Sequence, residues 1–409
     1  MISDVEERFD ELWAHGRSRS VRLISGPQGP RVLLDGKPVL LLCSSNHLGL
    51  ADHPRVREAA ADAAMRWGAG AGSSRLVSGT MTVHRRFEER MADFHETERC
   101  LLFGSGHLAA AGILPALARS GEVVHYDERC GPGIADGCRL AGAEALAYRH
   151  RDLDHLSSGL REAGGRASLI VTEGLFGLDG ALAPLPELVE LAHRHDARLV
   201  VDEGRALGAI GPRGRGAVAR AGLEDEVDVV LGTLGAALGS YGGYACCDAP
   251  TAGLIASGAH TFASSTALPP PSAAAALAAL DLLAGDSARV ERLERNARVL
   301  REALSVEGLS GPLSDSHVQL LPLRDGPSAT AAFEQAVQRG LLARPVGPPL
   351  LPEGVAGLHL SVMASHTKAE LRWAAGILSE IVAEHRRPAP APLAVAAPSG
   401  VFDGLREAA

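Results

Sequence analysis

Glycine-rich turns that follow short apolar runs are the features of this 409-residue sequence with the clearest chemical potential. The turn Gly104-Ser105-Gly106-His107 follows the run Cys100–Phe103 and opens a helical segment. Free backbone N–H groups and the helix dipole at such a turn form a seat for an anion such as phosphate. A tight turn without any ligand would use the same residues, so this turn alone leaves both interpretations open.

Four more segments follow short apolar runs in the same way. In a doubly wound sheet, ligands bind in the crevice at the carboxyl ends of the strands. We therefore expect these segments to meet the first turn around one site. They are Asp127–Gly133, Glu173–Gly177, Asp202–Arg205 and Gly232–Gly239.

The elements that must position these turns are strands and helices in alternation. Continuous apolar runs occur at 123–126, 169–172, 199–202 and 227–231, with helical patterns between most of them. Runs of this kind are typical of strands that are buried on both faces. The sequence thus predicts an α/β fold with a mostly parallel, doubly wound sheet and helices on both faces.

Flanking patterns suggest how the rest of the chain is organised. We expect an N-terminal helix and hairpin segment over 1–45, with the hairpin turning at Asp35-Gly36, and a large α/β domain over 46–285. A small C-terminal α+β domain should cover 286–385, and a Pro/Ala-rich tail 386–409.

Composition narrows the functional class. Hydrophobic residues make up 46% and charged residues 22%, and the net charge is −9, so nothing indicates a nucleic-acid-binding surface. The six cysteines have neither metal-ligand nor disulfide-scaffold spacing, and we expect no metal site. Without a signal segment or a long apolar stretch, the protein is expected to be cytoplasmic and not to contact a membrane.

Several motifs together resemble the α-oxoamine synthases, pyridoxal phosphate (PLP) enzymes that join an acyl thioester to an amino acid. The stretch Gly232–Gly239 resembles their Gly-Thr-Leu-Ser-Lys-Ala-Leu-Gly motif. The resemblance extends over roughly residues 20–385 and implies a fold-type I PLP-transferase architecture and a homodimer with sites at the subunit interface. Other matching stretches are Asn46–Leu50, Gly72–Gly79, Ser265–Pro270, Asp152–Leu156 and Ala364–Thr367.

The resemblance assigns roles to residues that are retained here. Ser105 and Gly106, together with His107, fall on the phosphate-binding turn. Asp202 falls on the acid that pairs with the pyridine nitrogen of PLP. Thr233 and Thr266 fall on phosphate contacts, and the second is expected to reach across from the other subunit.

Other positions depart from the family pattern. Ala236 replaces the lysine that forms the Schiff base, and the only lysines are Lys37, expected in a solvated turn, and Lys368, expected in an exposed first helical turn. An alanine methyl cannot form an imine. The remaining replacements are Gly131 for the ring-stacking histidine, Arg205 for the histidine near the PLP hydroxyl, Gly177 and Gly235 for two serines, and His359 for the arginine that grips the substrate carboxylate.

These losses predict an enlarged cavity that is released from PLP chemistry. We expect no covalently bound cofactor. Noncovalent PLP, held by the phosphate turn and Asp202, is left open by the residues but is disfavoured by the missing stacking face and imine.

The first functional hypothesis is a PLP-independent acyltransferase. It would pass an acyl group from a CoA or carrier-protein thioester to an amine or a hydroxyl, which requires a base, an oxyanion donor and proximity. Candidate groups are His107 and His47 as bases, Cys130 as nucleophile and Arg205 for an anionic substrate. Each has a purely structural alternative: local hydrogen bonds for the histidines, an inert loop thiol for Cys130, and pairing with Asp202 for Arg205.

The second hypothesis is a non-catalytic subunit. Some α-oxoamine synthases are heterodimers in which one subunit lacks the lysine, and retention of Thr266 suits such a partner of a lysine-bearing paralogue. Ionisable groups at 107 and 205 favour the enzyme instead.

Overall fold

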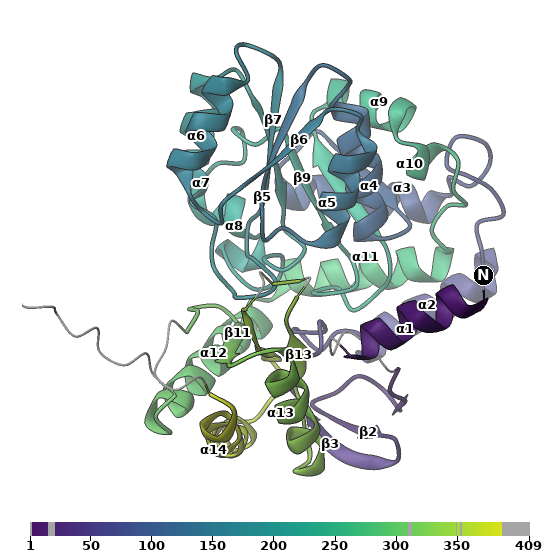
Figure 1. Cartoon of the computed structure of the whole chain (residues 1–409). Helices are drawn as coiled ribbons and strands as arrows, with labels where there is room; N and C mark the ends of the chain where they lie inside the picture. Colours follow the sequence, from purple (N-terminus) through teal and green to yellow (C-terminus); the bar gives the residue numbers. More distant parts are fainter. Residues whose placement is uncertain (1, 15–20, 310–312, 349, 352–353, 387–409) are drawn as a thin grey trace, which may run out of the picture.

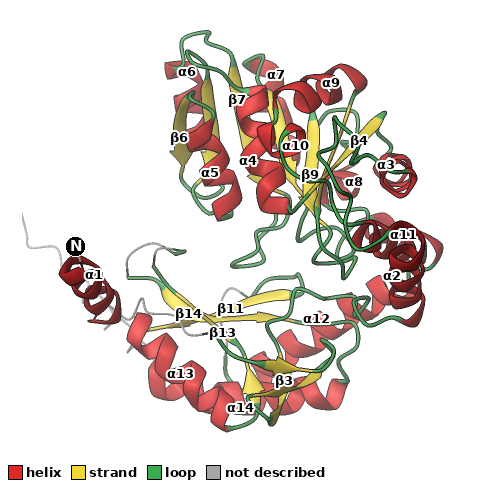
Figure 2. Ribbon diagram, turned by 90° about the vertical axis from the view of Figure 1, so that its right-hand side faces the viewer, coloured by secondary structure: helices red, strands yellow, loops and turns green. Residues whose placement is uncertain are grey.

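The computed structural model describes residues 2–14, 21–309, 313–348, 350–351 and 354–386. Nearly all of the predicted tail, from residue 387 on, therefore lies outside the described residues. The chain forms two lobes, a larger one around a broad sheet and a smaller one below it in Figure 2. Helices α2 (Pro54–Trp67) and α11 (Pro270–Gly285) pack against each other beside both lobes.

A seven-stranded sheet forms the centre of the large lobe (Figure 1). Its strand order is β4-β10-β9-β8-β7-β5-β6, and β10 runs antiparallel to both neighbours while β5 to β9 pair in parallel. The predicted doubly wound, mostly parallel sheet is confirmed. Its strands are β4 (Arg99–Phe103), β5 (Val123–Asp127), β6 (Glu144–Tyr148), β7 (Ser168–Glu173), β8 (Arg198–Asp202), β9 (Val229–Thr233) and β10 (Gly243–Cys247).

Helices cover both faces of this sheet because its strands are apolar on both sides. Val200 and Val201 are neighbours, both fully buried, yet they belong to the cores on opposite faces. On one face lie α4 (Gly106–Leu117), α5 (Pro132–Leu140), α9 (Ala249–Gly258) and α10 (His260–Ala263). On the other lie α3 (Thr82–His95), α6 (Leu153–Glu162), α7 (Leu185–Arg194), α8 (Ala217–Ala221) and α11; a 3-10 turn, η1 (Pro212–Gly214), precedes α8.

The small lobe has an antiparallel sheet in the order β11-β14-β13. Leu341 of β12 pairs in parallel with Leu40 of β3, so the N-terminal hairpin shares a second sheet with the C-terminal region (Figure 2). The strands are β1 (Ile24–Ser25), β2 (Arg31–Leu34), β3 (Lys37–Leu41), β11 (Val318–Leu323), β12 (Leu341–Leu342), β13 (Arg344–Val346) and β14 (Ala356–Ser361). The helices are α12 (Ala288–Val306), α13 (Gly326–Gln338) and α14 (Lys368–His385), and α1 (Ile2–Ala14) precedes the hairpin.

Both lysines lie far from strand ends of the large sheet. Lys37 follows the hairpin turn, where Asp35 and Gly36 have φ of 48° and 81°, and Lys368 opens α14; both are exposed, as predicted. Within the described ranges, no helix has the length and apolarity needed to cross a bilayer. The same ranges contain no group of three or more His, Cys, Asp or Glu side chains that could hold a metal ion.

Candidate active site

A cavity of about 790 Å³ lies at the carboxyl edge of the large sheet. Its walls come from the turns after β4, β5, β7, β8 and β9, so all five predicted segments meet there. Arg344 and Leu350 close it from the small lobe. Side chains that line it and could do chemistry are Ser45, Ser105, His107, Cys130, Glu173, Asp202, Arg205 and Thr233.

The first turn of α4 forms an anion seat against the end of β9. The Oγ of Ser105 caps the helix by accepting from Leu108 N at 3.1 Å. A Cβ on Gly106 would stand only 2.9 Å from the Cβ of Thr233, so only glycine brings the helix end this close. The Thr233 hydroxyl accepts from Gly235 N at 3.1 Å and donates to Gly242 O at 3.2 Å. Helix N-terminus and threonine thus form one cradle of the kind that holds phosphate.

Thr266 lies outside this cradle. It is exposed and is not among the residues that line the cavity. Ser74 bridges to it on the surface of the large lobe. Its contact with a phosphate of the other subunit therefore stays a prediction.

Two carboxyl groups lie side by side at the ends of β7 and β8, where Glu173 pairs with Asp202 in the strand register. Asp202 Oδ1 accepts from Gly204 N at 2.7 Å, and the two oxygens of Glu173 accept from Gly131 N at 2.6 Å and Gly177 N at 2.9 Å. Burial, and then the charge of Asp202, raises the pKa of Glu173 to about 7. Burial raises the pKa of Asp202 to about 6. Such a pair favours a cationic ligand atom or a shared proton.

The part played by Glu173 was missed in the sequence, where only its segment was expected to line the site. The available signal was its position at the end of a buried strand. This strand directly precedes, in sequence, the strand that ends at Asp202.

The glycines around the cavity do not simply enlarge it, which corrects the expectation from the sequence. Each of three glycines is in close contact with an ionisable side chain that occupies the space a Cβ would need. The pairs, measured from the position of that Cβ, are Gly131 with Glu173 Oε1 (3.2 Å), Gly133 with His107 Nδ1 (3.2 Å) and Gly177 with Arg205 Nε (3.2 Å).

His107 lies at the rim of the cavity, on the first turn of α4. Its side chain is 52% exposed, and its Nε2 is 3.4 Å from Oδ2 of Asp136. Asp136 also pairs with Arg139 at 2.6 Å. A partly exposed imidazole that is oriented by a carboxylate has the arrangement of a general base, so the role predicted for His107 stays a candidate.

Cys130 borders the cavity, but its geometry argues against a nucleophile. Its Sγ lies 3.9 Å from the carbonyl of Val171, to which the thiol donates weakly. Burial, followed by the charges of Glu173 and Asp127, raises its pKa well above the ordinary range. Because the thiolate is the reactive form, this thiol should be inert.

His47 is not brought to the cavity, which argues against the predicted role as base. It is fully buried and does not line the cavity, and its Nε2 donates to Leu207 O at 3.1 Å. Burial lowers its pKa to about 4. Its ring lies 4.7 Å from that of His317, centroid to centroid, so it belongs to a buried histidine cluster that the sequence did not reveal.

Arg205 does line the cavity, but it does not pair with Asp202 as the structural alternative required. Its Nη1 donates to the Oγ of Ser45 at 2.9 Å. Its charge still contributes to lowering the pKa values of Asp202 and Glu173 against the effect of burial. An anion-binding role for Arg205 thus remains open.

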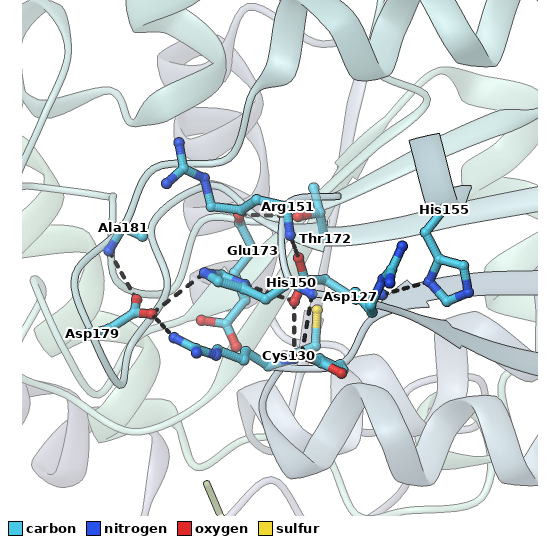
Figure 3. A network of polar contacts seen from close by, with 12 residues as sticks. Asp127, Cys130, His150, Arg151, His155, Thr172, Glu173, Asp179 and Ala181 are labelled. Atoms are coloured by element: carbon cyan, nitrogen blue, oxygen red, sulfur yellow. Dashed lines mark hydrogen bonds and ion pairs between the residues drawn. The ribbon is translucent and has the colours of Figure 1, made fainter. Parts of the chain in front are cut away.

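A polar network anchors the loop after β7 (Figure 3). Asp127 accepts from Nδ1 of His150 at 2.9 Å and from the amides of Arg129 (2.9 Å) and Arg151 (2.8 Å). Asp179 pairs with Arg129 and lies 3.4 Å from Nε2 of His150. Burial opposes a charge on His150, but its bonds to both aspartates outweigh burial and raise its pKa. The network therefore fixes the loop that carries Gly177.

Proteins similar to this chain over almost its whole length are 8-amino-7-oxononanoate synthases. The protein of that name from Citrifermentans bemidjiense is 41% identical over 380 residues, which covers 92% of this chain and 97% of that protein. Its counterpart from Geobacter metallireducens is 42% identical over 387 residues, covering 93% and 98%.

Solved structures of serine palmitoyltransferase have the same fold. A lysine-to-alanine variant from S. paucimobilis, with a bound PLP–myriocin aldimine, is 30% identical with a TM-score of 0.87 over 92% of this chain and 96% of that one. The enzyme from Sphingomonas wittichii has the same TM-score at 27% identity. The expectation of a cavity released from PLP chemistry, with noncovalent PLP disfavoured by the missing imine and stacking face, was wrong, because similar solved structures contain PLP, one of them in a lysine-to-alanine variant.

A family model also matches most of the chain. The model of the class I and II aminotransferases matches residues 37–378, which include both lobes and every wall of the cavity. The fold is that of the fold-type I PLP-dependent transferases. This chain belongs to the class I and II aminotransferase family.

Proposed function

We propose that this chain binds PLP without a covalent bond and acts as an acyltransferase of the α-oxoamine synthase type. It would join the acyl group of a CoA or carrier-protein thioester to an amino acid. The observation that carries the proposal is the cradle of Gly106 and Thr233 facing the same cavity as Asp202. Bound PLP supplies an electron sink for carbanion chemistry at the amino acid.

The residues present fit the phosphate and the ring nitrogen of PLP, the two parts of the cofactor that bind without a covalent bond. The N-terminus of α4 with Thr233 suits the phosphate, and Asp202 beside Glu173 suits a protonated ring nitrogen. Nothing replaces the covalent link, because Ala236 is a buried methyl, 2% exposed, at the cavity wall. Gly131 also offers no ring face.

Two side chains of this protein would assist the reaction. His107, oriented by Asp136, is the candidate for accepting or returning a proton at the rim of the cavity. Arg205 supplies positive charge for an anionic group of the substrate. Cys130 and His47 take no part, for the geometric reasons given above.

The proposed assembly is a homodimer, and the proposed division of the chain stays at residues 45, 285 and 385. The resemblance to the α-oxoamine synthases implies a dimer in which Thr266, exposed in this chain, completes the phosphate seat of the other subunit. Because β12 pairs with β3, the segment before residue 45 would move with the small domain.

A second candidate, the non-catalytic subunit, is favoured by one observation. Ala236 lacks the amine at the position where the resembling motif has lysine. In that case activity would require a lysine-bearing paralogue in the same assembly.

The test combines PLP binding with turnover. The purified full chain is dialysed against PLP to measure a dissociation constant, with Asp202→Ala as a variant that should bind more weakly. Release of free thiol from acyl-CoA and acyl-pantetheine is then followed with amino acids present, with and without PLP. We expect saturable PLP binding and release that depends on both PLP and the amino acid.

The outcomes separate the candidates. PLP binding without release, restored by adding a lysine-bearing homologue that co-assembles, would favour the subunit. Absence of PLP binding would overturn the proposed function. Release that is unchanged by removing PLP would also overturn it.

A further inference from the structure

Arg205 is a cation with no carboxylate in ion-pair contact in the part of the chain that the structure describes. Two other arginines that line the cavity each form an ion pair, Arg129 with Asp179 and Arg139 with Asp136. Among the described residues, no carboxylate oxygen lies within 4.0 Å of the Arg205 guanidinium, whose hydrogen-bond acceptor is the neutral hydroxyl of Ser45. A guanidinium in a low-dielectric site gains strongly from an anionic partner.

The nearby carboxyl groups do not fill this need. Asp202 is bonded to Gly204 N, and both oxygens of Glu173 accept from backbone amides. Burial raises the pKa values of Asp202 and Glu173, so these groups hold protons more readily than free carboxyls. With a pKa of about 6, Asp202 is still mostly ionised at neutral pH, so these carboxyls attract the guanidinium through space, but neither forms an ion pair with it.

Behind Arg205 stands a wall of three buried histidines, His47, His317 and His359, each 2% exposed or less. Burial is the largest cause that lowers all three pKa values, and Arg205 lowers each one further. The three rings are consequently neutral at pH 7. The wall adds no charge that would either compensate Arg205 or compete with it.

Only some of the ring nitrogens in this histidine wall form hydrogen bonds. Nε2 of His47 donates to Leu207 O and Nε2 of His359 donates to Gly177 O at 2.9 Å, because a carbonyl can only accept. Nδ1 of His47, Nδ1 of His359 and both nitrogens of His317 have no hydrogen-bond partner in the described residues. Since none of the three histidines lines the cavity, these atoms lie behind Arg205 and do not supply ligand contacts there.

Packing fixes where the guanidinium lies. The Cβ that Gly177 lacks would be 3.2 Å from Nε and 3.3 Å from Cγ of Arg205. The backbone of Gly177 is held on both sides, by Glu173 at its N–H and by His359 at its carbonyl. Arg205 is thus positioned by Ser45 and Gly177 before any ligand enters, which lowers the entropy lost on binding.

We propose that Arg205, supported by Ser45, binds the carboxylate of the amine substrate. The inference rests on the proposed function and names the residue that recognises the carboxylate of its amino acid substrate. In the proposed function the cradle at α4 would hold the phosphate of PLP, so Arg205 would be a second, separate anion site in the same cavity. A planar guanidinium and a planar carboxylate can form two parallel hydrogen bonds, so Arg205 can distinguish an amino acid from an amine that lacks the carboxylate.

The experiment uses two stable probes that need no chemistry by the protein. Reduced N-(5′-phosphopyridoxyl)-L-alanine contains a carboxylate, and N-(5′-phosphopyridoxyl)ethylamine lacks it but is otherwise alike. Their dissociation constants are measured by calorimetry on the full chain and on Arg205→Ala, Arg205→Lys and Ser45→Ala. Arg139→Ala is the matched control, because this arginine also lines the cavity but is already paired with Asp136.

We expect wild-type protein to bind the alanine conjugate at least about tenfold more tightly than the ethylamine conjugate, as one charged hydrogen-bonded contact warrants. Arg205→Ala should bring this ratio close to one while leaving affinity for the ethylamine conjugate within about twofold. Arg205→Lys should keep part of the preference for the alanine conjugate, and Ser45→Ala should reduce it. The control Arg139→Ala should show the same preference as wild type. Thermal unfolding of each variant checks that it folds.

Two results would overturn the inference. Equal binding of the two conjugates to wild-type protein would remove the carboxylate site while leaving the proposed function intact. An undiminished preference in a folded Arg205→Ala variant would place the site elsewhere. If neither conjugate binds wild-type protein, the proposed function falls as well.

Discussion

Gly177 leaves out the Cβ that would stand 3.2 Å from Nε of Arg205. Carbon and nitrogen atoms in ordinary contact lie farther apart, so the arginine occupies volume that a larger residue at 177 would need. The same glycine donates to Glu173 and accepts from His359. One residue without a side chain therefore connects the carboxyl pair, the unpaired cation and the neutral histidine wall.

Gly177→Ser should disturb Arg205 directly. Its φ lies outside the left-handed region, so serine introduces crowding without backbone strain. We expect about 1–3 kcal/mol lower stability in urea denaturation, as overpacking usually costs, and a weaker preference for the carboxylated conjugate. Gly70→Ser is the matched control, because a Cβ at Gly70 would have open space around it. Equal behaviour of the two variants would contradict the packing described here.

The buried carboxyl pair should make stability depend on pH. Glu173 has a folded pKa raised to about 7 from 4.5, so its contribution to stability is present below about pH 4.5 and is lost as pH rises through 7. His47 and His359, with pKa values lowered to about 4, act in the opposite direction between pH 4 and 6.5. The informative quantity is consequently the difference in unfolding free energy between wild type and Glu173→Gln at each pH.

For that variant we expect a gain in unfolding free energy relative to wild type, on the order of 2–3 kcal/mol, between pH 4.5 and 7.5. Urea denaturation at several pH values measures it. Glu58→Gln, on the exposed face of α2, should follow wild type throughout. If the unfolding free energy of Glu173→Gln changed with pH in parallel with that of wild type, Glu173 would be shown to ionise normally.

In the large sheet, the sequence indicated the five strands whose apolar runs are continuous, and it missed the other two. β6 is mostly exposed along Glu144–Tyr148 and lies at the sheet edge, so it has no apolar run to detect. β10, Gly243–Cys247, is fully buried, but its glycine and cysteines do not resemble a strand of branched residues. The pairing of β12 with β3 joins residues about 300 positions apart, and no local pattern encodes it.

The candidate site could be predicted in its location but not in its contacts. The five turns meet because carboxyl ends of parallel strands share one edge, which is a general rule. Tertiary packing decides that His47 does not reach that edge and that Cys130 borders it as a buried thiol, and both side chains bond to backbone carbonyls. The partnership of Glu173 with Asp202 depends on strand order, which spacing along the chain does not show.

Cys130→Ser should leave turnover nearly unchanged. The thiol has a pKa well above its ordinary range because of burial and then Glu173, so it stays protonated at working pH. We expect thiol release from acyl-CoA within about twofold of wild type, and slow alkylation of Cys130 by iodoacetamide compared with a small thiol. Loss of release by two or more orders of magnitude in the folded variant would restore Cys130 as a nucleophile.

Gly106→Ala should weaken phosphate binding. The added Cβ would lie 2.9 Å from the Cβ of Thr233 and must push the end of α4 away from β9. We expect PLP affinity to fall about tenfold or more, measured by equilibrium dialysis. Gly253→Ala in α9 is the control: its Cβ would meet nothing, so affinity should not change and stability should rise by about 0.5–1 kcal/mol. Unchanged PLP affinity in Gly106→Ala would place the phosphate elsewhere.

Ala236→Lys should convert noncovalent PLP into covalently trapped PLP. The alanine lines the cavity at the turn after β9, close in sequence to Thr233 of the phosphate cradle, so a lysine there can place its amine beside the ligand. We expect borohydride to fix PLP to the peptide that contains residue 236, as detected by mass spectrometry. The chain supplies a clean background, since its other lysines are Lys37 and Lys368, both exposed.

The control is the same variant in a Lys37→Arg, Lys368→Arg background, which has no other lysine amine. Trapping at residue 236 should persist there, whereas the double variant that retains Ala236 should acquire no PLP on a lysine while still binding it reversibly. Reversible binding without trapping in the lysine variant would mean that the reactive carbon of PLP lies away from residue 236. The anion cradle would then orient PLP differently from the way proposed here from the positions of Asp202 and Thr233.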